Sequence, residues 1–172
     1  MLNVLAKSKS EDFVPFSFDE RSDNEMVQCD TLPLREQRTV VFYLLYMLDS
    51  SAYEVSMESI IDQFSRGYFC VIKPHGFITQ RALSITQQRD ALDGAIKPLL
   101  QNWKLERLSV TTRLLLRMAL WELKNTPLDI PVVINEALEL AKMFAEQDSY
   151  KFINGILDEW SKRNPRPPFV TV

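Results

Sequence analysis

Glycine is scarce in this chain, with four glycines among 172 residues. Tight turns and phosphate-cradling loops depend on glycine, so this scarcity favours helices over sheets. The four positions also spell neither a Walker A loop nor the glycine fingerprint of dinucleotide-binding folds, which excludes both of these nucleotide sites. The two cysteines, Cys29 and Cys70, and the single histidine, His75, lack the spacing of a zinc site. We therefore expect a helical protein with no metal and no cofactor.

Long apolar segments are absent as well. The longest unbroken apolar run, Val40 to Leu48, has nine residues, whereas a membrane-spanning helix needs roughly 20. The N-terminal apolar stretch is interrupted by Asn3 and is too short for a signal peptide. With no membrane segment and no disulfide pattern, we expect a cytoplasmic protein. The sequence leaves open whether Cys29 and Cys70 meet.

The formal net charge of −3 averages two unlike parts of the chain. Residues 1–34 carry three basic and seven acidic side chains, whereas residues 35–172 carry 17 basic and 16 acidic ones. Because residues 1–33 are also rich in serine and show no hydrophobic period, we expect a disordered acidic extension there. We expect a tail at 165–172, at the other end of the chain. Residues 97–117 hold five basic side chains and one acidic one, which fits either a solvated helix face or a phosphate-binding strip.

Apolar residues recur at helical spacing from residue 35 onward. The expected helices span 35–49, 53–65, 79–102, 110–124, 131–145 and 148–163. Because proline lacks an amide donor, we expect the third helix to bend near Pro98, and Ser109 is the expected N-cap of the fourth. Six helices with short links predict an all-α bundle over residues 34–164. The 103–109 link divides it into two packed three-helix subdomains, 34–102 and 109–164.

No catalytic set emerges from the polar residues. A nucleophile activated by an imidazole must use His75, which falls in a connecting segment beside Pro74. Paired carboxylates such as Asp90 and Asp93 have the spacing of solvent-facing helix turns, and nothing marks them as an acid–base pair. We therefore expect no enzymatic activity.

Two asparagines, Asn135 and Asn154, lie at the edges of apolar helix faces, and we expect both to bridge neighbouring helices in the core. Gly155 follows in mid-helix, where glycine costs about 1 kcal/mol relative to alanine. Its presence there predicts the close approach of another backbone.

The segment from Asp148 to Phe152 combines several features of a nucleic-acid contact. It opens a helix, where free backbone amides favour anions. It contains one cation, Lys151, and two rings, Tyr150 and Phe152, that can stack on unpaired bases. Asp148 can cap the helix or accept a hydrogen bond from a base amino group. Taken alone, however, an N-cap followed by a core phenylalanine is the simpler interpretation.

Three motifs follow one another between residues 113 and 160: RLLLRMALWEL, VVINEALELAKMF and DSYKFINGILDEW. In this order they resemble the C-terminal half of the NusB family of transcription antitermination factors. The resemblance is strong over 109–160, moderate over 88–101 and 35–49, and weak over 50–80, and residues 1–33 lie outside it. It implies a NusB-like bundle of two packed three-helix subdomains without enzymatic activity.

The resemblance also implies partners. Family members bind boxA, a short single-stranded RNA element of nascent ribosomal RNA, together with the ribosomal protein NusE, and the complex helps RNA polymerase to read through termination signals. The RNA-binding residues that the resemblance implies are Arg35, Arg38, Asp148, Lys151 and Phe152. The partner contacts that it implies are Tyr46 and Thr112.

This chain departs from the family pattern at several of these positions. The N-terminal arginine cluster of the family is reduced to Arg35 and Arg38, with Glu36 between them. Fewer phosphate contacts predict weaker RNA binding with a shallower salt dependence. Many members also have an acidic residue in place of Thr112 and a histidine in place of Tyr150.

Two other functions therefore stay open. A helical protein-interaction module that has lost RNA binding fits the reduced arginine cluster and the acidic extension. An RNA-binding front domain of a ribosomal RNA methyltransferase would need a catalytic domain beyond Val172. Family members occur as monomers or homodimers, so the resemblance also allows a homodimer.

Overall fold

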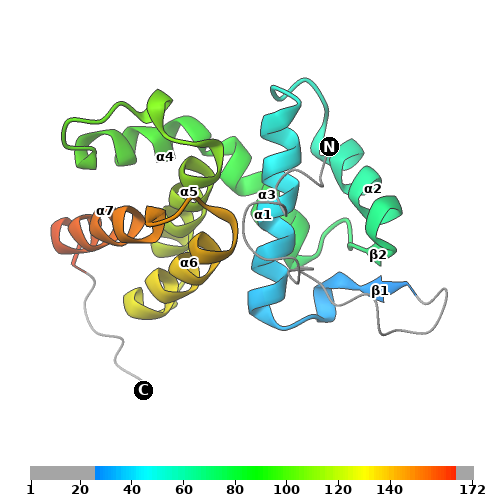
Figure 1. The fold of residues 1–172 in the computed structure, drawn as a ribbon. Helices are drawn as coiled ribbons and strands as arrows, with labels where there is room; N and C mark the ends of the chain where they lie inside the picture. Colours follow the sequence, from blue (N-terminus) through cyan, green and yellow to red (C-terminus); the bar gives the residue numbers. More distant parts are fainter. Residues whose placement is uncertain (1–25, 166–172) are drawn as a thin grey trace, which may run out of the picture. The chain divides into compact units, whose positions relative to one another are not determined.

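The computed structural model describes residues 26–165. In that part of the chain it contains seven α-helices, two short β-strands and three 3₁₀ turns (Figure 1). The chain divides into two compact units, residues 1–87 and 88–172. The extension expected over residues 1–25 and the tail expected over residues 166–172 lie outside the described residues. The predicted all-α class is confirmed.

The first unit is built around α1 (Leu34–Ser50). This helix packs against α2 (Met57–Tyr68) and α3 (Phe77–Gln87). The middle of α1 is buried almost all round, as its long apolar run predicts. The start of α2 lies later than the sequence suggests because Ser56 caps the helix, where its hydroxyl accepts a hydrogen bond from the Ser59 amide at 3.2 Å.

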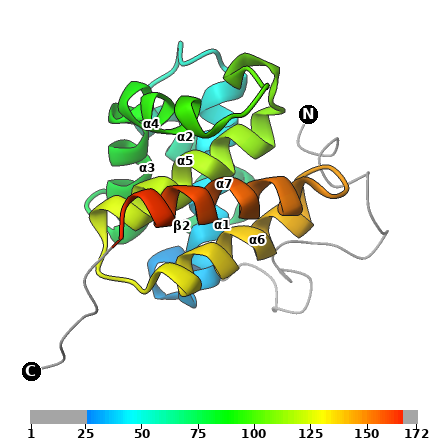
Figure 2. The same cartoon turned by 90° about the vertical axis from the view of Figure 1, so that its left-hand side faces the viewer.

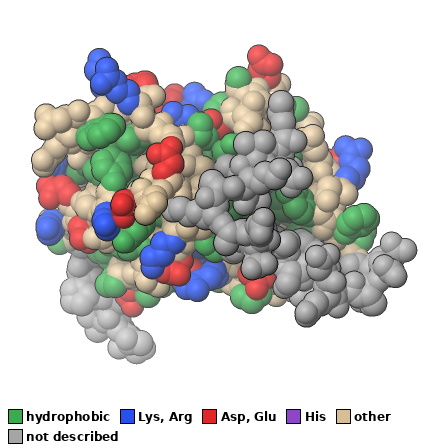
Figure 3. Space-filling view, viewed as in Figure 1, with side chains coloured by type: hydrophobic (Ala, Val, Ile, Leu, Met, Phe, Trp, Pro, Cys, Tyr) green, Lys and Arg blue, Asp and Glu red, His purple; other side chains and the backbone are tan. Residues whose placement is uncertain are grey.

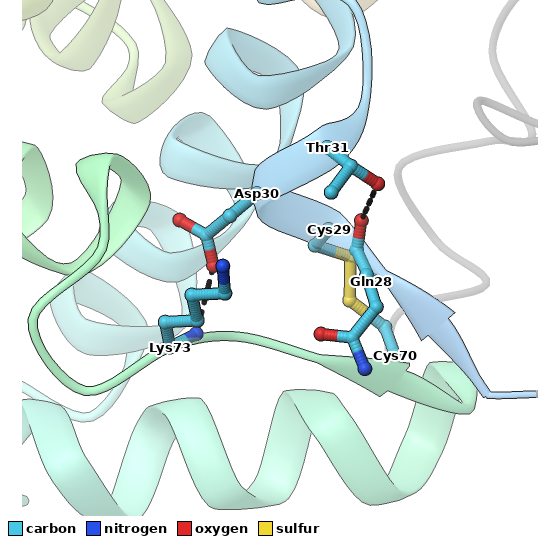
Figure 4. Close-up of a disulfide and its surroundings, with 6 residues drawn as sticks. All are labelled: Gln28, Cys29, Asp30, Thr31, Cys70 and Lys73. Carbon is cyan, nitrogen blue, oxygen red and sulfur yellow. Dashed lines mark hydrogen bonds between the residues drawn. A yellow bond between two sulfur atoms is a disulfide. The ribbon is translucent and has the colours of Figure 1, made fainter.

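A short parallel strand pair belongs to the same unit. β1 (Val27–Gln28) pairs with β2 (Cys70–Val71), with Val27 opposite Cys70. The 3₁₀ turn η4 (Cys29–Thr31) follows β1. A disulfide joins Cys29 to Cys70 across a Cα–Cα distance of 6.0 Å (Figure 4), and both cysteines are fully buried. We call residues 26–33 the N-terminal clasp.

Polar contacts hold the N-terminal clasp at two further points. The Asp30 carboxylate accepts a hydrogen bond from the backbone amide of Lys73 at 2.8 Å (Figure 4). The side-chain amide of Gln37, on α1, donates to the carbonyl oxygens of Asp30 and Leu32 at 3.1 and 2.7 Å. The expected disorder is therefore wrong for residues 26–33, because a covalent bond, strand pairing and side-chain hydrogen bonds order a segment whose composition is polar.

The second unit is built around α5 (Val110–Asn125). This helix packs against α4 (Arg89–Ile96), α6 (Ile130–Phe144) and α7 (Ser149–Arg163). Figure 2 shows α7 lying against α5 and α6. The Ser109 cap is confirmed, since the Ser109 hydroxyl accepts a hydrogen bond from the third amide of the α5 turn at 3.3 Å. The predicted bounds of α1, α5, α6 and α7 agree closely with the structure.

The single helix predicted over residues 79–102 is wrong. The backbone leaves the helical region at Gln88, where ψ is 9°, and this residue separates α3 from α4. Pro98 then lies in the 3₁₀ turn η5 (Lys97–Leu99) rather than in a bent α-helix. No proline or glycine marks the break at Gln88, so the spacing of apolar residues predicts one continuous helix across it.

The boundary between the two units differs from the predicted one for the same reason. It falls between Gln87 and Gln88, not in the 103–109 link. The apolar side chains Leu92 and Ile96 of α4 are fully buried, and α4 packs against α5. The second unit therefore has four helices within the described residues, where the sequence suggests three.

A membrane-spanning helix and a metal site each require a particular set of side chains. Between residues 26 and 165, no helix is both long enough and apolar enough to cross a bilayer. The same residues contain no group of three or more His, Cys, Asp or Glu side chains placed to hold a metal ion. His75 is exposed in the turn that precedes α3.

Candidate nucleic-acid interface

The first turn of α7 carries the segment expected to bind nucleic acid. Asp148 stands at the N-cap position in a left-handed backbone conformation, with φ at 68°, and its side chain makes no capping hydrogen bond. Its carboxylate instead lies 2.9 Å from the Lys151 ammonium, and both side chains are more than half exposed. The hydrogen bond to Asp148 and the negative charge of that residue raise the pKa of Lys151. Of the two roles expected for Asp148, capping of the helix by its side chain is therefore wrong, and the carboxylate instead pairs with an exposed cation.

Aromatic rings flank this ion pair. Tyr150 is half-buried, and the Nζ atoms of Lys151 and Lys142 lie 5.8 and 5.9 Å from its ring centroid. These distances fall within the range of cation–π attraction. Phe152 is also half-buried, and its ring meets the Trp103 ring edge-on, with centroids 6.4 Å apart and planes at 63°. Phe152 is thus not a fully buried core residue, and part of its side chain stays in water.

Trp103 is the residue of this surface that sequence reasoning missed. From the sequence, it is only the first residue of a link between helices. In the structure its side chain is 57% exposed and contacts the first turn of α7. The one available signal is local, since a large aromatic residue between Asn102 and Lys104 interrupts a polar and basic segment.

The basic residues of 97–117 do not form one phosphate-binding strip. Arg117 is buried, and its guanidinium donates two hydrogen bonds to the Asp93 carboxylate, at 2.7 and 2.8 Å. Lys104 and Arg107 are exposed. Neither a solvated helix face nor a single phosphate-binding strip describes the whole segment. Arg117 is buried in an ion pair, whereas Lys104 and Arg107 are exposed in the link before α5.

The N-terminal residues of α1 present only one of the two expected arginines. Arg35 is exposed in the first turn. Arg38, one turn later, is 4% exposed and therefore does not offer its guanidinium to a ligand at the surface. This burial does not agree with the expected surface contact by Arg38. It depends on how α1 packs against its neighbours, and the spacing of residues along the sequence does not show it.

The two expected partner contacts also differ in exposure. Tyr46 is half-buried on α1, with its ring centroid 6.3 Å from that of Phe42. Thr112 is 5% exposed, and both its amide and its hydroxyl hydrogen-bond with the Ser109 hydroxyl at 3.3 and 3.0 Å. Thr112 therefore belongs to the cap of α5, and its burial does not agree with the expected surface contact.

The asparagine and glycine positions of the last two helices are corrected as well. Asn135 is exposed, and the Asn154 amide donates to Asp158 on its own helix at 3.2 Å. A Cβ added at Gly155 would meet nothing within 4 Å. The expected helix-bridging asparagines and the expected close backbone approach are therefore wrong.

The structure thus brings together three of the expected RNA-binding residues. Asp148 is the N-cap of α7, and Lys151 and Phe152 lie in the first residues of that helix in the second unit. Arg35 and Tyr46 lie on α1 in the first unit. The arrangement on α7 joins an exposed cation, a carboxylate acceptor and an accessible ring, which can meet a phosphate, a base amino group and a base face.

The sequence model of the NusB family matches residues 35–162. The chain belongs to the NusB family. It is 36% identical over 128 residues to the transcription antitermination protein NusB of Macrococcus caseolyticus, an alignment that covers 72% of this chain and 92% of that protein. It is also 35% identical over 123 residues to the NusB protein of Staphylococcus carnosus, covering 72% and 94% of the two chains.

Two solved structures share the fold of this chain. The crystal form of T. maritima NusB has a TM-score of 0.66 at 31% identity and covers 76% of this chain and 92% of that one. A structure described as a plectonemic RNA supercoil matches with a TM-score of 0.65 at 21% identity, over 75% of this chain and 94% of that one. The second likeness shows the fold alone.

Membership in the NusB family establishes the general function. The family comprises transcription antitermination proteins, and these are not enzymes, which confirms the expectation of no enzymatic activity. The residues of the N-terminal clasp, 26–33, lie outside the part of the chain that matches the family.

Proposed function

We propose that this NusB-family protein binds a boxA-type single-stranded RNA in nascent ribosomal RNA together with the ribosomal protein NusE. The resulting complex promotes read-through by RNA polymerase. The observation that carries the proposal is the first turn of α7, where Lys151, Asp148 and Phe152 present a cation, an acceptor and a ring side by side.

Each of these groups meets a different part of an unpaired nucleotide. Lys151 is an exposed cation that lies 2.9 Å from the Asp148 carboxylate, and its ammonium can pair with a phosphate. Phe152 offers a ring for base stacking, which tolerates every base. The second oxygen of the Asp148 carboxylate can accept a hydrogen bond from a base amino group.

Two of the expected residues are accessible in the first unit. Arg35 is exposed at the start of α1 and is the phosphate contact that we propose for this unit. Tyr46 is the proposed contact to NusE, because it is the half-buried residue of the two expected ones. Arg38 and Thr112 are not included, since both are buried. With one exposed arginine at the start of α1, the salt dependence of RNA binding should be shallow for the family.

The test is fluorescence anisotropy of a labelled boxA-type RNA, titrated with the full chain at two salt concentrations, with and without NusE. We expect binding that tightens with NusE and weakens with salt. Lys151→Glu should weaken it by at least about tenfold, because it replaces a phosphate contact with a like charge. Phe152→Ala should weaken it about fivefold or more through the loss of base stacking.

Lys162→Glu is the matched control. Lys162 is exposed in the last turn of the same helix, so this variant makes the same charge change at the opposite end of α7. It should change affinity much less than Lys151→Glu. If Lys151→Glu and Phe152→Ala bind the RNA like the unaltered protein, with helical circular dichroism intact, the proposed RNA surface is wrong.

A second candidate function is a protein-interaction module that binds NusE without RNA. The burial of Arg38 favours it, because a single exposed arginine remains where the family has a cluster. Titration of NusE alone separates the two, since tight binding of NusE with no effect of RNA would support the second candidate. A methyltransferase front domain is not proposed, because the relatives described above are antitermination proteins.

A further inference from the structure

Trp103 stands apart from the other two tryptophans of the chain. Its side chain is 57% exposed, whereas Trp121 and Trp160 are 9% and 8% exposed. It lies in the link between α4 and α5, directly after Asn102, whose backbone is left-handed with φ at 62°. The exposed indole leaves an aromatic face accessible to a ligand, and it does so in contact with the ring of Phe152.

The exposed indole is nevertheless held in place. Its ring meets that of Phe152 edge-on, with centroids 6.4 Å apart, which is a favoured geometry for aromatic pairs. Phe152 is fixed in the first turn of α7. The contact therefore positions the indole beside the residues that carry the proposed function, and it leaves more than half of the indole surface accessible.

Exposed cations in the link that holds Trp103 and in the first turn of α7 favour a polyanion as the ligand. Lys104 and Arg107 are exposed in the same link, and Lys151 is exposed one residue before Phe152. Figure 3 shows hydrophobic side chains on the α4–α7 side of the molecule interspersed with Lys, Arg and acidic side chains rather than joined into one apolar face. An apolar protein partner would need a continuous apolar face, whereas single-stranded nucleic acid needs rings and cations in alternation.

We propose that Trp103 is a base-stacking residue, which nothing in the family motifs assigns. One base of the bound single-stranded RNA stacks on the exposed indole, next to the base received by Phe152, and the intervening phosphate lies near Lys104 or Lys151. This inference rests on the proposed function and adds a second nucleotide to the same surface.

The chain carries its own reporter for the test. Because Trp121 and Trp160 are buried, Trp103 is the tryptophan that a base can reach, and stacking should quench its fluorescence. We expect saturable quenching of the intrinsic emission when the full chain is titrated with a boxA-type RNA. Trp103→Phe should abolish this quenching while RNA binding, measured by anisotropy, stays within about threefold, because phenylalanine keeps a stacking face.

Trp103→Ala should weaken RNA binding by about fivefold or more, the loss expected for one stacked base. Val132→Ala is the control, because Val132 is another exposed apolar residue of the second unit, 47% exposed. It lies in the first turn of α6, at the opposite end of that helix from the link to α7, and its loss should leave affinity and quenching unchanged.

The outcomes separate the inference from the proposed function. If the RNA binds by anisotropy but the unaltered chain shows no quenching and Trp103→Ala binds normally, the role of Trp103 is wrong and the proposed function stands. If quenching persists in Trp103→Phe, the signal comes from another tryptophan, and the role of Trp103 is also wrong. If no RNA binds under any condition, both are overturned.

Discussion

Asp93 of α4 and Arg117 of α5 form a nearly buried ion pair with two hydrogen bonds, at 2.7 and 2.8 Å. The side chains are 16% and 6% exposed. Removing one partner of such a pair is strongly destabilising, because the remaining charge in the interior loses its counter-ion. This pair therefore connects α4 firmly to the second unit, although the sequence suggests that α4 belongs with the first.

Asp93→Ala should lower the free energy of unfolding by about 3–5 kcal/mol, because the buried Arg117 loses its two hydrogen bonds to a carboxylate. Urea denaturation followed by circular dichroism measures the change. Asp62→Ala provides the comparison, since Asp62 pairs with Arg66 where the side chains are 64% and 74% exposed. Its loss should cost less than about 1 kcal/mol, and an equal cost for both variants would contradict the prediction.

A second prediction concerns the N-terminal clasp. A Cβ added at Gly76 would overlap the carboxylate of Asp30, which is held by its hydrogen bond to the Lys73 amide. Gly76→Ala should therefore lower the free energy of unfolding by about 1–3 kcal/mol, the cost of overpacking. Thermal or urea unfolding of the purified chain provides the measurement.

The cause of that cost can be isolated with a double-mutant cycle. In an Asp30→Ala background the overlapping carboxylate is gone, so Gly76→Ala should cost much less than it does alone. Gly94→Ala is the matched control, because a Cβ added there would meet nothing within 4 Å. Equal costs of Gly76→Ala in both backgrounds would show that the carboxylate is not responsible.

A third prediction follows from the free space around Gly155. The residue lies in the interior of α7, and a Cβ there would meet nothing within 4 Å. Gly155→Ala should raise the free energy of unfolding by about 0.5–1 kcal/mol, because alanine loses less backbone entropy in a helix. A lower melting temperature for this variant would contradict the prediction and would support the close backbone contact that the sequence suggests.

A fourth prediction concerns alkaline pH. Burial raises the pKa of Tyr43, and the neighbouring Tyr68 adds to the effect. Burial also raises the pKa of Tyr68. Because the unfolded state loses these protons first, the free energy of unfolding should fall as the pH rises above about 10, the ordinary tyrosine value.

Urea denaturation on either side of that pH measures the slope, and ultraviolet absorbance of tyrosinate reports the titration. Tyr43→Phe removes the more perturbed phenol while keeping its ring, so the slope should become shallower. If the slope is the same in both proteins, Tyr43 does not carry the effect.

The helices that the sequence predicts well have local signals at both ends. Ser109 caps α5, and prolines at 127 and 131 punctuate the link to α6, so both bounds are visible in the sequence. The features that it misses depend on distant residues. The strand pair joins residues 27–28 to 70–71, and two-residue strands leave no periodicity to detect.

Exposure at the site is likewise set by packing. Helical spacing and the family resemblance place Arg38 and Phe152 in one functional class, yet the structure buries Arg38 and leaves Phe152 partly accessible. The opposite holds for Trp103, since a large apolar side chain is expected to be buried but this one is exposed. Its exposure becomes visible only when the link before α5 is seen against α7.

The Cys29–Cys70 bond makes the intervening backbone a closed covalent ring. The two residues are 41 positions apart, and the ring carries the whole of α1 and α2. A protease that cuts the exposed connection between these helices would linearise the ring without releasing a fragment, because the disulfide still joins both ends. The exposed arginine at the start of α1 would then stay attached to the rest of the molecule until a reductant opens the bond.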